Sequence, residues 1–212
     1  MQLVIDTSTK QVIAAVIDGG RILWQADIPA VLQGASEILP QMQTAIAAGK
    51  WSLEDIQEVV IGIGPGSYTG LRVGMAIAKM FAFAKKLPLS GISSLKGLVS
   101  EKEGLFAVVV DARSGGAYIL KGKKTSASNV EWYSEPQRVA WENVAAYLTG
   151  YSLWITPDKT SLMFSLQERL PFEQRAALVS VNILETCVSP VWIAAQVSQA
   201  TYDYQIVSLQ YT

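Results

Sequence analysis

A buried strand that leads directly into a glycine-rich loop and a long helix is the feature that most restricts the fold of this chain. The apolar run at 59–63 predicts a strand buried on both faces. The loop at 64–70 follows it, and a helix is expected at 71–86, with two lysines at the end where the helix dipole favours cations. Pro88 ends the helix, and residues 89–92 predict another strand. The segment therefore requires a sheet with at least one helix packed beside it.

A second pattern, an apolar strand that ends in an aspartate, occurs twice. Residues 3–5 lead into Asp6, and residues 108–110 lead into Asp111. In both places a small polar turn and further strands follow. We interpret this as a weak internal repeat of two lobes, 1–103 and 104–212, of which the second is short and diverged. Chance is the alternative, because strands that end in aspartate are common.

Other elements follow from turn signals, caps and periodicity. Ser52 and Asp55 form a pattern similar to a capping box, which predicts a short helix. The lysine-rich run at 121–124 is expected at an exposed hairpin tip. The remaining strands are predicted at 11–17, 21–28, 105–110, 117–121, 130–134 and 153–155, and the remaining helices at 36–48, 93–102, 141–148, 161–170 and 190–200.

The composition excludes several kinds of chemistry. The chain has 212 residues, no histidine and one cysteine, Cys187. Without histidine it has no His-dependent triad, no His general base and no His metal ligand. One cysteine allows neither a disulfide framework nor a CxxC zinc site. We therefore expect no resident metal.

Charge and hydropathy limit the partners. Lys and Arg total 17 and Asp and Glu total 18, a net charge of −1, so no basic field exists to hold a polyanion. The N-terminus does not have the pattern of a signal peptide, and the longest apolar helical stretch, 73–84, is too short to span a bilayer. We expect a cytoplasmic protein with no membrane association.

The loop at 64–70 has two interpretations. Its N–H groups and the dipole of the following helix can receive a phosphate. Alternatively, Ser67 or Thr69 caps the helix, and the loop is a structural turn. Its glycine spacing matches neither a Walker loop nor the dinucleotide fingerprint. The candidate phosphate or nucleotide cleft consists of Asp6, Gly64, Gly66, Ser67, Thr69, Gly70, Arg72 and Asp111.

The two aspartates in that set can likewise be interpreted either as ligand-binding residues or as structural residues. If the lobes are related by a pseudo-twofold axis, Asp6 and Asp111 both point into the cleft and can hold Mg²⁺–phosphate through water. The alternative is that each carboxylate holds its own turn through Asx-type hydrogen bonds.

Small residues recur every four positions along the helix after the loop. Gly70, Gly74 and Ala78 leave one face smooth enough for another backbone to approach closely. A glycine inside a helix costs about 1 kcal/mol relative to alanine, so Gly74 needs an offsetting contact. We predict a subunit interface there; packing inside the first lobe is the alternative. The candidate interface consists of Ile38, Met42, Gly70, Gly74, Met75 and Ala78.

The run from Gly64 to Gly74, GPGSYTGLRVG, resembles the signature of the TsaB (YeaZ) family. Further similarities are IDTS at 5–8, ILP at 38–40, GISSL at 91–95 and DAR at 111–113. The resemblance is specific over residues 1 to about 120 and weak beyond. Family members often carry an acidic residue after the last of these motifs, where this chain has two glycines at 115–116.

The resemblance implies an α/β, two-lobed, actin-like or sugar-kinase-like (ASKHA) fold with mixed sheets flanked by helices. It implies a non-catalytic scaffold and dimerisation subunit for installing threonylcarbamoyl on adenosine 37 of tRNA. The subunit would pair with and stabilise a TsaD-type catalytic subunit through the first two long helices, with a TsaE-type ATPase joining. Alone it would form a homodimer, and tRNA would be reached only through the complex. The metal motif of the catalytic relative needs histidines that this chain lacks.

Two other functions remain open at this stage. An autonomous ATP-dependent phosphotransferase or hydrolase of the same fold would use Asp6, Asp111 and the loop at 64–70. A homodimeric binding protein without a catalytic partner is the third. We expect no cofactor of the chain's own, and ATP or ADP bound only weakly or within the complex, because no lysine stands in a Walker position.

Overall fold

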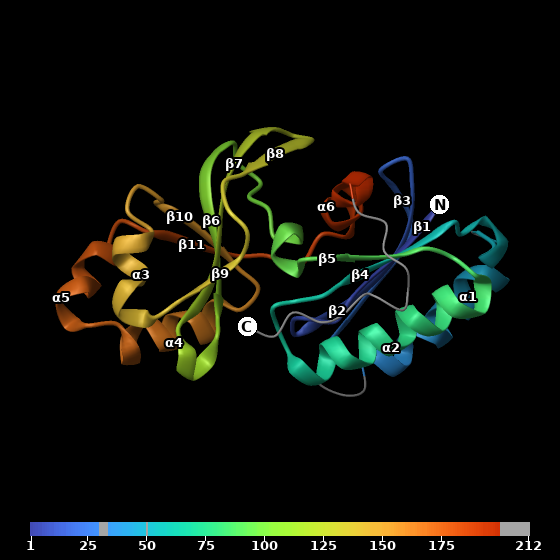
Figure 1. Ribbon diagram of the computed structural model, residues 1–212, viewed down its shortest axis with the longest axis horizontal. Coiled ribbons are helices and arrows are strands. Elements are labelled where there is room, and N and C mark those ends of the chain that lie inside the picture. Colours follow the sequence, from blue (N-terminus) through green and yellow to red (C-terminus); the bar gives the residue numbers. More distant parts are fainter. Residues whose placement is uncertain (30–33, 50, 200–212) are drawn as a thin grey trace. The chain divides into compact units, whose positions relative to one another are not determined.

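The computed structural model describes residues 1–29, 34–49 and 51–199, and the chain divides into two compact units (Figure 1). Of the described residues, unit 1 contains those in the ranges 1–97 and 188–199, and unit 2 contains residues 98–187. Each unit is built around its own mixed sheet. Among the described residues, no helix has both the length and the apolar character that crossing a bilayer requires.

The sheet of unit 1 has the strand order β3-β2-β1-β4-β5. The first three strands form an antiparallel meander, and β4 and β5 continue from β1 in parallel. The parallel pairings require crossovers, which the two long helices of the unit supply. The strands are β1 (Gln2–Asp6), β2 (Gln11–Asp18), β3 (Arg21–Pro29), β4 (Glu58–Gly62) and β5 (Leu89–Ile92); the helices are α1 (Ile38–Ala47) and α2 (Tyr68–Lys85).

The sheet of unit 2 repeats this plan with the order β8-β7-β6-β10-β11. Again three antiparallel strands are followed by two parallel ones, and the short β9 pairs with β7. The shared topology confirms the internal repeat. The strands are β6 (Gly104–Asp111), β7 (Ala117–Ser126), β8 (Asn129–Trp132), β9 (Gln137–Val139), β10 (Leu153–Thr156) and β11 (Asn182–Glu185); the helices are α3 (Trp141–Tyr147), α4 (Lys159–Arg169) and α5 (Phe172–Arg175).

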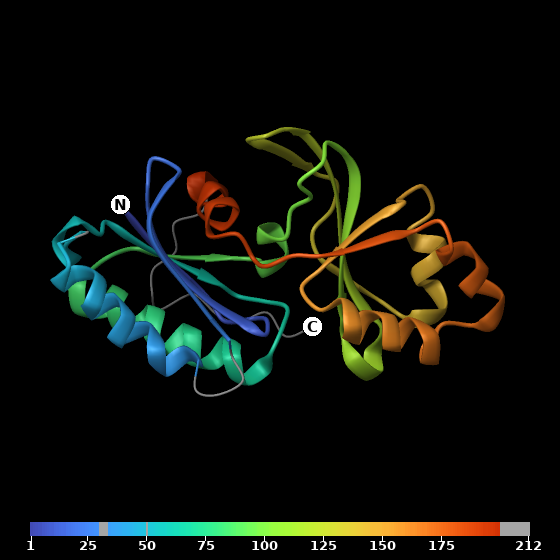
Figure 2. The ribbon, with the colours of Figure 1, turned by 180° about the vertical axis from the view of Figure 1, so that it is seen from behind.

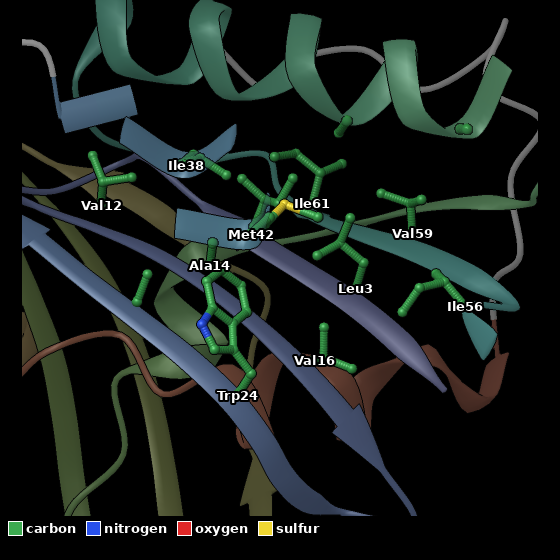
Figure 3. Packing of buried hydrophobic residues seen from close by; sticks show 14 of the residues in the cluster. Leu3, Val12, Ala14, Val16, Trp24, Ile38, Met42, Ile56, Val59 and Ile61 are labelled. Atoms are coloured by element: carbon green, nitrogen blue, oxygen red, sulfur yellow. The ribbon is translucent and has the colours of Figure 1, made fainter. Parts of the chain in front are cut away.

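Helices cover both faces of the first sheet. Figures 1 and 2 show α1 and α2 side by side on one face, and Figure 3 shows Ile38 and Met42 of α1 packed over strand residues such as Leu3. The other face is covered by α6 (Pro190–Ala195), which contacts β1, β2 and β4. Strand side chains alternate between the faces, and because both faces are covered, strand residues such as Val4 and Val60 are fully buried as well.

The core of unit 2 lies between its sheet and the helices α3 and α4. Trp154 of β10 and Leu162 and Leu166 of α4 are buried there. The indole Nε1 of Trp154 donates to the carbonyl of Tyr151 at 2.8 Å, which satisfies the only polar atom of that side chain.

Three expectations about the fold are wrong. The expected helix at 93–102 is a single 3₁₀ turn, η3 (Ser94–Gly97), and the lysine-rich run at 121–124 lies inside β7 rather than at a hairpin tip. The segment from residue 188 returns to unit 1 instead of remaining with the second lobe. The segment returns because α6 buries the face of the first sheet that α1 and α2 leave open.

Candidate functional site

The glycine-rich loop lies where three strands of unit 1 end at the same edge of the sheet. The amide of Ser67 donates to the carbonyl of Ser8 after β1 at 2.7 Å. The amide of Gly64 donates to the Ser94 hydroxyl after β5 at 3.1 Å, and the amide of Ser94 returns a bond to the Gly64 carbonyl at 2.9 Å. The loop is therefore bonded to the turns on both of its sides.

Asp6 lies beneath this loop and is completely buried. Its Oδ1 accepts from the amide and the hydroxyl of Ser8, at 2.8 and 2.6 Å. Its Oδ2 has no hydrogen-bond partner among the described residues. Burial raises the pKa of the Asp6 carboxyl, and the Ser8 and Ser94 groups around it oppose that rise only in part. The protonated, neutral form is thus favoured more than in water.

Close approach explains two glycines around this carboxyl. A Cβ on Gly62 would overlap the Asp6 carboxylate, and a Cβ on Gly66 would overlap the carbonyl of Ser8. Gly62 thus makes room for a side chain and Gly66 for a backbone. The backbone of the strand-to-helix turn is fixed by contacts inside the unit.

The helix start is capped by the chain itself. Ser67 Oγ accepts from the amide of Gly70 at 3.2 Å, so the capping interpretation is confirmed for Ser67. Thr69 is exposed. Arg72 donates from Nη1 to the Tyr68 hydroxyl at 3.1 Å, and its guanidinium lies 5.4 Å from the centre of that ring. A phosphate contact by this loop stays a prediction.

Asp111 occupies the equivalent strand end in unit 2, and its carboxylate is held locally. Oδ1 accepts from the amide of Arg113 at 2.6 Å. Oδ2 accepts from the hydroxyls of Ser161 and Ser165, each at 2.9 Å. Both hydroxyls come from α4, so Asp111 ties the end of β6 to that helix. The same contact to the amide two residues on occurs at Asp6, which supports the Asx-turn interpretation for both.

The predicted subunit interface is wrong for the small-residue face of α2. A Cβ on Gly70 would overlap the carbonyl of Thr7, and a Cβ on Gly74 would overlap the Thr7 hydroxyl. The face therefore packs on the turn after β1 within unit 1. The four larger candidates are buried in the same unit and are unavailable to another chain: Ile38, Met42, Met75 and Ala78.

A face of α2 adjacent to the small-residue face carries an exposed apolar stripe that sequence reasoning missed. Val73 is 40% exposed, Met80 46% and Phe83 67%, and Ile77 is half-buried between them. Leu39 of the neighbouring α1 is also exposed. The signal was present in the spacing 73, 77, 80, which places three large apolar residues on one helix face. Large exposed apolar side chains in a row are typical of an interaction surface.

Comparison with known proteins identifies the family. A family model described as "TsaD: tRNA N6-adenosine threonylcarbamoyltransferase" matches residues 32–141. The chain is 31% identical over 138 residues to the tRNA threonylcarbamoyladenosine biosynthesis protein TsaB of Escherichia coli K12, covering 63% of this chain and 58% of that protein. It is 40% identical over 68 residues to TsaB of Bacillus subtilis, covering 31% of this chain and 30% of that protein. The chain thus spans between about a third and three fifths of the length of these two relatives.

The fold agrees over the whole chain. The structure of YeaZ from Pseudomonas aeruginosa superposes with a TM-score of 0.77 at 17% identity, covering 100% of this chain and 99% of that one. The expected α/β fold of two mixed sheets flanked by helices is confirmed. The chain belongs to the family that the TsaD model defines and, within it, to the TsaB (YeaZ) proteins.

Proposed function

We propose that this protein is a non-catalytic subunit of the machinery that makes threonylcarbamoyladenosine on tRNA, and that it pairs with a TsaD-type catalytic subunit. The names of its TsaB relatives support the pathway. The exposed apolar stripe of α2 carries the pairing proposal, because it offers a continuous helix surface for a second helix pair.

The internal contacts of the candidate site support a non-catalytic role. Asp6 is completely buried and burial raises the pKa of its carboxyl, so it is a poor ligand for Mg²⁺–phosphate. Asp111 already accepts three hydrogen bonds. The amides of Gly64, Ser67 and Gly70 donate to partners inside unit 1. Most groups that an autonomous phosphotransferase would need are thus engaged by the chain's own structure, and the one unpartnered carboxylate oxygen, Asp6 Oδ2, is completely buried.

We propose the remaining partners from the resemblance to the family. A TsaE-type ATPase joins the pair, and tRNA is bound through the complex rather than by this chain, whose net charge is −1. ATP or ADP binds weakly or only within the complex. In the absence of the catalytic subunit, the α2 stripe is covered by a second copy of this chain, because the same apolar surface then has no other partner.

The pairing is tested with the TsaD homologue of the same organism. Met80→Asp places a charge in the centre of the stripe, where an apolar interface cannot solvate it. We expect the complex to be lost in size-exclusion chromatography with light scattering, and the modified nucleoside to fall in a reconstituted tRNA assay. Phe164→Asp is the matched control, since Phe164 is also an exposed apolar residue, at 62% against 46% for Met80, and lies on α4 of unit 2.

Two results would contradict the proposal. The first is a complex that forms equally well with Met80→Asp and with the unchanged protein. The second is ATP turnover by the purified chain alone that disappears in an Asp6→Ala variant with an intact fold, which would favour the autonomous enzyme.

A further inference from the structure

A groove with a volume of about 390 Å³ runs along α4 in unit 2, bordered by β11 and the segment after α5. Its size lies at the lower end of the range typical of small-molecule sites. The pairing surface is on α1 and α2, so this groove belongs to different elements of the fold. We propose that it binds an amphipathic carboxylate, a small molecule with a hydrocarbon tail and one anionic end.

The apolar part of the groove matches the tail. Leu166, Leu178 and Ile183 line it, and Leu166 and Ile183 belong to the buried core of unit 2. Met163 and Val179 line it at the surface, where Val179 is 87% exposed. A tail laid between these residues would remove apolar surface from water on both sides.

The charged residues of the groove match the anionic end. Among the described residues that line it, the charged ones are Lys159 and Arg175, both cations. Neither side chain forms an ion pair in the described part of the chain. Arg175 donates only its Nε, to the carbonyl of Leu170 at 3.0 Å. Its two terminal nitrogens remain available for the bidentate contact that guanidinium makes with a carboxylate.

Lys159 is a less favourable partner than Arg175 for the anionic end of the ligand. Its backbone amide donates to the Glu185 carboxylate at 2.8 Å, which places a negative charge near the start of α4. We therefore assign the carboxylate end to Arg175 and the tail to the apolar stretch that runs along α4 from there. A ligand with a cationic head group would be repelled by both side chains and would bind poorly.

The test uses decanoate as the probe and isothermal titration calorimetry on the full chain. We expect decanoate to bind roughly tenfold more tightly than octanoate, because two further methylenes are buried. Decyltrimethylammonium has the same tail length and the opposite charge, and we expect it to bind at least roughly tenfold more weakly than decanoate.

Two surface variants distinguish binding in this groove from nonspecific adsorption of the probe. Arg175→Gln should weaken decanoate about tenfold, and Val179→Asp, which adds a carboxylate at an exposed position, should abolish binding. Arg169→Gln is the matched control, because it removes a cation from α4 outside the groove. Thermal melts confirm that each variant is folded. No binding of decanoate, equal binding of the cationic probe, or an unchanged affinity in Arg175→Gln would overturn the proposal.

Discussion

Replacing Gly74 by alanine tests directly what the small-residue face of α2 does. A Cβ at this position would lie 3.0 Å from Thr7 Cγ2 and 3.2 Å from Thr7 Cβ, and it would overlap the Thr7 hydroxyl. That hydroxyl donates to the Gly70 carbonyl at 2.8 Å. Thr7 cannot rotate away without giving up this bond, so the new methyl group must displace the turn after β1.

Three contributions set the expected size of the effect. Overpacking costs about 1–3 kcal/mol, and loss of the Thr7 hydrogen bond costs about 1 kcal/mol. Alanine instead of glycine inside a helix returns about 1 kcal/mol. The free energy of unfolding should therefore fall by about 1–3 kcal/mol, which lowers the melting temperature by roughly 3–10 °C for a chain of this size.

The assay is urea unfolding followed by circular dichroism, as a double-mutant cycle with Thr7→Ala. Removing the Thr7 hydroxyl and methyl makes room for the new group, so Gly74→Ala should cost at least about 1 kcal/mol less in that background. Ala76→Gly is the control on the same helix, because residue 76 is exposed; it should cost about 1 kcal/mol in either background.

Two results would refute this account of Gly74. One is a cycle in which the two substitutions add to within about 0.5 kcal/mol. The other is a Gly74→Ala variant that gains stability, as helix propensity alone would predict. Light scattering on the same samples should show an unchanged molecular mass, because the face lies inside unit 1.

Three further substitutions probe the strand ends. The raised pKa of Asp6 means that the folded state binds the carboxyl proton more tightly than the unfolded state does, so the free energy of unfolding should fall as pH rises from about 4 through the folded pKa. The Asp6→Asn variant has no such proton, so its urea midpoint should not show this decline between pH 4 and 8. Identical pH profiles for the variant and the unchanged protein would contradict this prediction. Ser67→Ala removes the cap of α2 and should cost about 1 kcal/mol in the same unfolding assay, whereas no loss would argue against the cap. Asp111→Ala leaves Ser161 and Ser165 without their acceptor and should cost about 1–3 kcal/mol; hydrogen exchange should show faster opening of α4, and unchanged protection would exclude the tie.

Local signals in the sequence were sufficient for most elements of this protein. The strand at 59–63, the turn at 18–20 and the capping pattern at Ser52 depend on neighbouring residues, and all three occur in the structure. The repeated strand–aspartate pattern also predicted two lobes, and the two sheets have equivalent strand orders. The helix expected at 93–102 does not form, because the tertiary contacts of η3 with α6 outweigh the weak helix propensity of these residues.

The sequence indicated where the candidate residues lie in the fold but not what surrounds them. The sequence placed Asp6 and the loop at 64–70 at strand ends, yet it could not show that Asp6 would be fully buried, because the covering groups come from segments more than 50 residues away. The sequence likewise identified the small-residue face of α2 but not the residue that packs against it. That partner is Thr7, which lies far from Gly74 along the chain.

Most of the helices and strands, the two-lobe pattern and the absence of histidine chemistry could be inferred from residue type and from spacing within one segment. Which face of each helix is buried, and which unit contains residues 188–199, depend on the assembled tertiary structure. A helix such as α2 has apolar or small residues on more than one side, and local patterning does not distinguish a face that packs inward from one that meets a partner. Burial is a property of all segments that pack together, so the distinction between Gly74 inside and Met80 outside arises only when the sheet and both helices are assembled.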